Sequence, residues 1–205
     1  MDIAQLIFYF CIIIPSAILH EYAHGAVADS LGDPTARYAG RLSLNPLVHI
    51  DRWGTVLMPL LLFIVSSGRF IFAYAKPVPY NPYNLRNQRW GPAVVAIAGP
   101  GTNFLLAFIF GLAMQYLGST SLSFFFSVIV YANIGLGIFN LVPIPPLDGS
   151  KLLYALLPES ANSVRLLLDR YGFVMVLVFA LFFSSLLSPV IAALYHWFTG
   201  GVGGF

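Results

Sequence analysis

The sequence predicts an all-α polytopic membrane protein with about four spanning helices. Of its 205 residues, 59% are hydrophobic and only 9% are charged, whereas a soluble domain carries about 25% charged residues. Several apolar segments reach the ~20 residues that an α-helix needs to cross a bilayer. The chain shows no internal repeat and no shift in composition. We therefore expect residues 1–205 to form a single membrane-embedded domain.

Four apolar segments account for the expected crossings, and they run over residues 3–31, 91–117, 122–142 and 172–197. Pro15 permits a kink in the first segment, and Pro189 permits a bend in the last. Residues 150–171 are amphipathic and charged, so we expect them to lie outside the spanning helices.

A shorter apolar segment over residues 54–75 contains Pro59 and is broken by the polar residues 66–69. Its uninterrupted part is about a dozen residues long, which is short for a crossing, so we expect a re-entrant segment here. Before it, polar and apolar residues alternate over residues 38–44, and this alternation predicts a short β-strand or hairpin.

The basic residues indicate the topology. All ten Lys and Arg residues fall within residues 32–91 or residues 150–171. The positive-inside rule places both regions in the cytosol and therefore both termini outside. Residues 32–91 then begin and end on the same side, so they cross the membrane either twice or not at all. A re-entrant dip is the simpler solution.

The segment His20-Glu21-Tyr22-Ala23-His24 lies near the C-terminal end of the first expected helix. Histidines at positions i and i+4 share one face of a helix. This spacing allows two imidazoles to bind one zinc ion, while the glutamate between them acts on a water at the metal. Polar groups at membrane depth are costly and are usually functional.

A zinc site needs a third ligand, and the candidates are Asp148, His49, His196, Asp51 and Asp29. Asp148 is favoured because it follows a proline-broken helix end and shares the leaflet of the histidine pair. His196 is expected on the opposite side of the membrane. His49 and Asp51 belong to a polar loop, where a solvated role is the simpler interpretation. Asp29 is expected to point away from the histidine face.

With these motifs the sequence resembles the site-2 protease family of intramembrane zinc metalloproteases. The matching segments are His20-Glu21-Tyr22-Ala23-His24, Ala98-Gly99-Pro100-Gly101-Thr102-Asn103 and Asn140-Leu141-Val142-Pro143-Ile144-Pro145-Pro146-Leu147-Asp148-Gly149. Residues 40–46 and 75–79 resemble the compact bacterial and archaeal branch, without PDZ-like or CBS-like modules.

The resemblance implies that His20, His24 and Asp148 hold one zinc ion per chain and that Glu21 is the general base of peptide hydrolysis. It also implies that Asn140 hydrogen-bonds the substrate backbone and that Asn103 acts near the site, on the substrate or the transition state. The implied substrate is a single-pass transmembrane protein, cleaved within or near its membrane segment. The implied location is a prokaryotic cell membrane, with the active site near the cytosolic face.

A substrate helix must be unwound locally, because its peptide bonds are hidden in its own hydrogen bonds. The strand expected over residues 39–44 would offer the unwound segment a partner by β-augmentation.

Two other classes of function remain open. In a membrane metal-ion transporter, the same His, Glu and Asp groups would line an ion path, although the chain lacks the repeat that transporters show. The third class is a non-catalytic protein that binds membrane helices, and the complete set of His20, Glu21, His24 and Asp148 argues against it. The net charge of +2 gives no reason to expect nucleic acid, and the oligomeric state is not determined.

Overall fold

Every regular element in the described part of the chain is a helix. The computed structural model describes residues 3–65, 76–117 and 121–202. The longer helices are α1 (Ile3–Ser30), α4 (Gly91–Leu117), α5 (Ser121–Asn140), α7 (Asn162–Val178) and α8 (Ser188–Thr199). The shorter ones are α2 (Thr35–Tyr38), η1 (Pro46–His49), η2 (Arg52–Leu57), α3 (Met58–Val65), η3 (Pro82–Asn84), α6 (Gly149–Leu156), η4 (Glu159–Ala161), η5 (Phe179–Phe183) and η6 (Ser184–Leu187).

Four helical segments of the described residues are long and apolar enough to cross a membrane, which confirms the predicted class. They are Cys11–Ser30, Gly91–Leu117, Leu122–Asn140 and Asn162–Thr199. The helices that contain the first three, α1, α4 and α5, agree closely with the expected ranges 3–31, 91–117 and 122–142. Helix α4 continues without a break through Pro100.

The last apolar segment differs from its prediction in two respects. It begins at Asn162, ten residues before the expected start, because the second half of the amphipathic, charged stretch 150–171 forms the first turns of α7. Arg165 donates from Nη2 to the carbonyl oxygens of Tyr154 and Leu157, and these bonds join α7 to α6. The chain then bends within residues 179–187, so that Pro189 falls in the first turn of α8.

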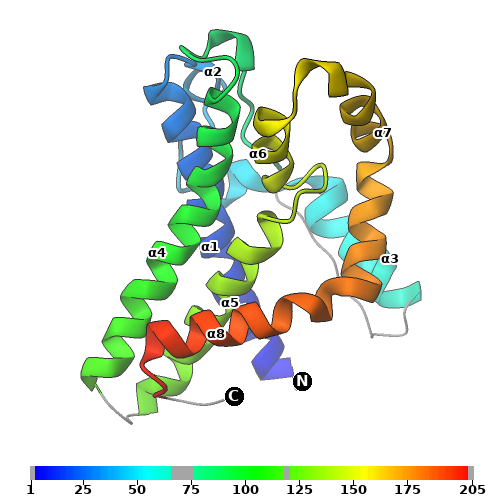
Figure 1. Ribbon diagram of the computed structural model, residues 1–205. Coiled ribbons are helices and arrows are strands. Elements are labelled where there is room, and N and C mark those ends of the chain that lie inside the picture. Colours follow the sequence, from blue (N-terminus) through cyan, green and yellow to red (C-terminus); the bar gives the residue numbers. More distant parts are fainter. Residues whose placement is uncertain (1–2, 66–75, 118–120, 203–205) are drawn as a thin grey trace.

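Helices α1, α4 and α5 form the central bundle, and α8 lies across α4 and α5 (Figure 1). The core between them contains Ala107, Met114, Val130, Ile134, Tyr195 and Phe198. Gly111 permits this crossing, because a Cβ at that position would lie 2.6 Å from the carbonyl oxygen of Phe198. Gln115 donates from Nε2 to the same oxygen at 2.7 Å and fixes the end of α8.

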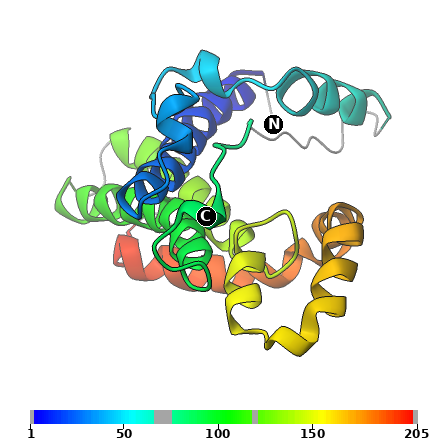
Figure 2. The ribbon, with the colours of Figure 1, turned by 90° about the horizontal axis from the view of Figure 1, so that it is seen from above.

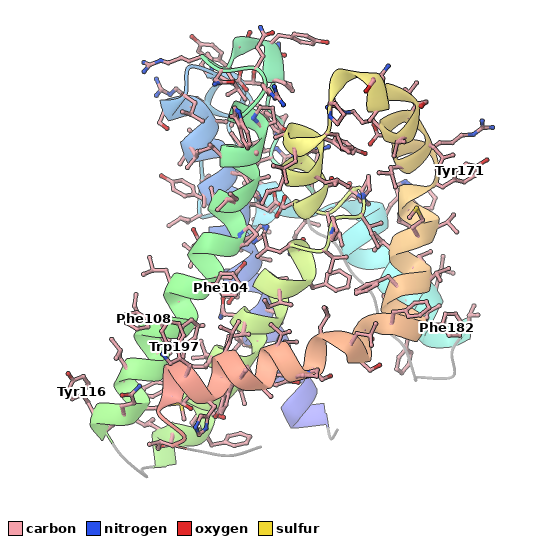
Figure 3. The ribbon with its side chains drawn as sticks, in the orientation of Figure 1. Phe104, Phe108, Tyr116, Tyr171, Phe182 and Trp197 are labelled. Atoms are coloured by element: carbon pink, nitrogen blue, oxygen red, sulfur yellow. The ribbon has the colours of Figure 1, made fainter. Side chains whose placement is uncertain are left out.

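Helices α3 and α7 stand away from the central bundle, as Figure 2 shows from above. Apolar and aromatic side chains cover the periphery, where Tyr116, Tyr171 and Phe182 point outward (Figure 3). The exposed fractions of these residues are 88%, 48% and 72%. Exposed large apolar side chains recur along α3, α4, α7 and η5, and lipid is the solvent that suits them.

The strand predicted over residues 38–44 is wrong. Helix α2 ends at Tyr38 and is followed by Gly40 in the left-handed region, with φ +65°. The amide of Gly40 donates to Arg37 O at 3.0 Å and that of Arg41 donates to Ala36 O at 2.9 Å. This pair of bonds is a Schellman motif, which turns the chain at a helix C-terminus. The alternation of residue types therefore belongs to a helix end.

The first part of the expected re-entrant segment is helical, in η2 and α3. Residues 66–75 lie outside the described residues, so the re-entrant path stays a prediction.

Asp33 joins the turn after α1 to the loop before α4. Its side chain is fully buried. Its Oδ1 accepts hydrogen bonds from Thr35 and from Nδ2 of Asn84 at 2.8 Å, and its Oδ2 accepts one from the amide of Asn81 at 2.6 Å. Burial opposes the negative charge, but the hydrogen bonds outweigh it and hold the pKa of Asp33 below its usual value.

Asp33→Asn tests this contact. Because the folded-state pKa is lowered, the carboxylate stabilises the fold above about pH 4, and its contribution is lost as the pH falls through the folded-state pKa. We expect Asp33→Asn to cost about 1–3 kcal/mol at neutral pH and to flatten the acid side of the stability profile. Thermal unfolding in detergent from about pH 7 to about pH 3 measures both effects.

Asp29→Asn is the matched control, because Asp29 pairs with the exposed Arg37 and a surface pair contributes less than about 1 kcal/mol. If the two variants lose the same free energy of unfolding, the role given to Asp33 is contradicted.

Candidate metal centre

Two helix-borne imidazoles and one carboxylate converge inside the bundle. His20 and His24 lie one turn apart on α1, and Asp148 lies directly before α6. Ligand atoms of the three residues all lie within 4.8 Å of one another. Oδ2 of Asp148 is 3.1 Å from Nε2 of His20 and 3.3 Å from Nε2 of His24. Both imidazoles are largely buried.

The hydrogen bonds of the two imidazoles fix their tautomers. Nδ1 of His24 lies 2.7 Å from Val95 O. A carbonyl oxygen only accepts, so this Nδ1 carries the proton. Nδ1 of His20 lies 2.6 Å from Oδ1 of Asn103 and donates to it in the same way. In its neutral form each ring therefore turns its Nε2 lone pair toward Asp148, as metal-ligating histidines do.

This donor set fits one zinc ion. With neutral imidazoles, two Nε2 lone pairs and a carboxylate face one another, and a bound cation would relieve their mutual repulsion. Two histidines and one carboxylate form a set of three protein ligands that leaves a fourth position open on zinc.

Residues at intervals of four on one face of α4 contact the two histidines. Val95 and Asn103 hold the two Nδ1 atoms, and Gly99 lies between them in the sequence. A Cβ at Gly99 would lie 2.4 Å from Nε2 of His24 and 2.5 Å from Nε2 of His20. Glycine is therefore required where α4 passes the imidazoles.

Asp148 reaches the histidines because of the turn that precedes α6. Its side chain makes no capping hydrogen bond to α6. The following Gly149 packs against the end of α5, since a Cβ there would lie 2.1 Å from Leu141 O. Within the turn, the amide of Leu147 donates to Ile144 O at 2.9 Å. These contacts set the depth of the carboxylate.

Glu21 follows His20 on α1 and contacts the irregular segment over residues 76–80. Its Oε2 accepts a hydrogen bond from the amide of Val78 at 2.9 Å. The flanking Pro77 and Pro79 have no amide hydrogen. Val78 therefore supplies this donor at the centre of the segment, against the helix that carries the histidines.

The two asparagines singled out in the sequence have different surroundings. Asn103 is fully buried and contacts His20 through Oδ1. Asn140 is the last residue of α5, and its Nδ2 donates to Leu136 O at 2.9 Å. The structure thus brings Asn103 to the back of the cluster, while the hydrogen bond of Asn140 is made within its own helix.

The other four candidate ligands lie outside the cluster that the described residues form. His49 donates from Nε2 to Ser43 O at 2.8 Å. Asp29 pairs with Arg37. Oδ1 of Asp51 accepts from backbone amides at the start of η2, and His196 lies on α8.

Sequence reasoning missed Ser16 and Asn133. Nδ2 of Asn103 donates to Oδ1 of Asn133 at 3.0 Å, and Nδ2 of Asn133 donates to Oγ of Ser16 at 3.0 Å. Their signal was available, because Asn133 is a polar residue in the middle of an apolar helix, where such residues are costly.

Comparisons with known proteins agree with this geometry. The sequence model of peptidase family M50 matches residues 112–183, which include Asn140 and Asp148. The chain is 38% identical over 189 residues to "Putative zinc metalloprotease YwhC" of Bacillus subtilis (strain 168), covering 87% of this chain and 81% of that protein.

More distant relatives carry similar names. "Putative zinc metalloprotease Rip2" of Mycolicibacterium smegmatis is 26% identical over 186 residues, covering 89% of this chain and 69% of that protein. "Putative zinc metalloprotease MJ0611" of Methanocaldococcus jannaschii is 42% identical over 140 residues, covering 66% and 63%. No solved structure matches the chain.

Gly99→Ala tests the close approach of α4. The added methyl group would overlap both Nε2 atoms, so we expect the purified variant to lose most of its bound metal while remaining helical. Elemental analysis and circular dichroism measure the two properties.

Gly101→Ala is the control, since a Cβ at Gly101 meets nothing within 4 Å, and it should keep its metal. Full metal content in Gly99→Ala would show that the packing between α1 and α4 differs from that described.

Proposed function

The chain belongs to peptidase family M50, the site-2 protease-like family of intramembrane zinc metalloproteases, and we propose that its catalytic centre consists of His20, Glu21, His24 and Asp148. The observation that carries the proposal is the convergence of the two Nε2 atoms and one carboxylate, with both Nδ1 atoms occupied by other partners. His20, His24 and Asp148 would hold one zinc ion. We extend the proposal to the whole chain, residues 1–205, as a single membrane-embedded protease domain.

Zinc, when bound by these residues, supplies Lewis-acid activation of water and of the scissile carbonyl. Glu21 accepts the proton of the attacking water and later delivers it to the leaving amine. The amide of Val78 holds Oε2 of Glu21, and Oε1 is then the oxygen that takes the proton. The same hydrogen bond orients the carboxylate against α1.

The two asparagines receive separate roles in this proposal. Asn140 lies partly exposed at the end of α5, close in sequence to the Asp148 turn, and it would donate to the backbone of an unwound substrate. Asn103 is fully buried. It would therefore act through His20, by holding the Nδ1 proton, and not on the substrate directly.

M50 proteases cleave membrane proteins, and we propose a single-pass transmembrane protein as the substrate. The scissile segment must leave its helix before its carbonyls become accessible, because the carbonyls inside a helix accept backbone hydrogen bonds from residues four positions later. The C-terminal end of α1 and helix α6, the elements that carry or follow the residues of the centre, lie toward the end of the molecule with α2 and the connection between α6 and α7 (Figure 1). A substrate segment near that membrane face would reach them soonest.

We further propose that this end faces the cytosol and that both termini lie outside. The start of α1 and the C-terminal end of α4 lie at the opposite end of the molecule (Figure 1). Arg37 lies in α2, and Arg86 and Arg89 lie in the connection between η3 and α4 beside it. These basic residues thus belong to the α2 end, as the positive-inside rule requires of a cytosolic face.

Glu21→Gln tests the catalytic proposal. The amide cannot accept a proton from water, so cleavage of a co-expressed single-pass substrate should fall by at least about a hundredfold, while the zinc content stays at one ion per chain. Asp148→Ala should lose both zinc and cleavage, because a ligand is removed.

Cleavage by Glu21→Gln at the wild-type rate would exclude Glu21 as the base. Transport of zinc into proteoliposomes without cleavage of any membrane substrate would favour the transporter instead.

Cysteine accessibility tests the topology. In a Cys11→Ser background, Arg86→Cys should react with an impermeant maleimide only after the cytosolic face is exposed, and Tyr116→Cys should react from outside in intact cells. Tyr116 is 88% exposed, so its label is not limited by burial. Labelling of both positions from one side would overturn the arrangement.

A further inference from the structure

A chain of buried polar side chains extends from His20 into the bundle. It contains Ser16 and His20 from α1, Asn103 from α4 and Asn133 from α5. The exposed fractions of Ser16 and His20 are 5% each, and those of Asn103 and Asn133 are zero. Such groups are costly to bury unless each finds a hydrogen-bond partner. Here hydrogen bonds join all four residues.

The direction of every hydrogen bond in this chain is set at its inner end. Nδ2 of Asn133 lies 2.9 Å from Ile129 O, and a carbonyl oxygen accepts only. The amide orientation of Asn133 is therefore fixed, and its Oδ1 must accept from Nδ2 of Asn103. Asn103 in turn presents Oδ1 to His20, whose Nδ1 must donate.

We propose that Asn133, supported by Ser16, is a positioning residue for the metal centre that sets which nitrogen of His20 is free to bind zinc. This inference rests on the proposed zinc site. Asn133 does not touch the metal ligands and acts only through Asn103. Ser16 accepts the second amide hydrogen of Asn133 at 3.0 Å, so the amide is held at both hydrogens.

Removal of the Asn133 acceptor has a definite chemical consequence. Nδ2 of Asn103 would lose its partner, and a rotated Asn103 amide would direct an N–H toward Nδ1 of His20. The imidazole would then keep its proton on Nε2, the atom that faces Asp148. A protonated Nε2 cannot bind zinc, so the metal would have to displace that proton and reorient Asn103.

Asn133→Leu removes the acceptor while keeping the same branched arrangement of four side-chain heavy atoms. We expect the dissociation constant for Zn²⁺, measured by chelator competition on the purified full chain in detergent, to rise about 10–100-fold. The visible absorption spectrum of the Co²⁺-loaded variant should shift, because the geometry at His20 changes.

Ser127→Ala is the matched control. Ser127 is also a buried polar residue of α5, and its hydroxyl bonds to that of Tyr195 at 2.6 Å, away from the cluster. Loss of this hydrogen bond should lower thermal stability but leave the zinc dissociation constant within about twofold of wild type.

Asn133→Asp separates positioning from simple packing. It keeps an oxygen that accepts from Asn103 but loses the donors to Ile129 and Ser16. Positioning predicts a zinc affinity closer to wild type than that of Asn133→Leu, even where thermal stability is lower. Asn133→Ala gives the same comparison if the leucine variant does not fold.

The outcomes are distinguishable. Wild-type protein that binds no Zn²⁺ would refute the proposed metal centre. If the wild-type protein binds Zn²⁺ and Asn133→Leu binds it with the same dissociation constant, only the positioning role of Asn133 is refuted. If Ser127→Ala raises the zinc dissociation constant as much as Asn133→Leu does, at an equal loss of thermal stability, the effect is one of packing. That outcome would also refute the positioning role of Asn133.

Discussion

The close, antiparallel contact between α1 and α4 is the constraint on which the centre depends. Val95, Gly99 and Asn103 recur every four residues along one face of α4, and they meet His24 and His20 in reverse order along α1. One helix thus supplies the Nε2 atoms, and its neighbour holds both rings from behind. The absence of a side chain at Gly99 leaves room for both Nε2 atoms beside α4.

Part of this arrangement could be predicted from the sequence, because it depends on residues that lie close together along the chain. The histidine pair follows from an i, i+4 interval, and Asp148 follows from a proline-rich turn in the same leaflet. Asn133 could not be placed in this way, since its role depends on which face of α5 meets α4. The strand prediction for residues 38–44 failed for a related reason. Alternating residue types suit both a strand and a helix end, and only the left-handed Gly40 separates them.

The final apolar segment shows the limit of hydropathy as a guide. Its residues are apolar enough to cross the membrane, and its composition is equally suitable for a straight helix or a bent one. The direction of α8 is set by a tertiary contact, the approach of Phe198 to Gly111 on α4. Nothing in the local sequence of α8 specifies that partner.

The distribution of the ligands along the chain also fixes when the centre becomes complete during synthesis. A nascent chain that has inserted α1 and α4 already carries both imidazoles and the helix that orients them. The carboxylate arrives only when the residues after α5 have left the ribosome. Because metal binding is linked to folding, tight retention of the ion follows the insertion of three helices, and a truncated chain ending before Asp148 holds an incomplete ligand set.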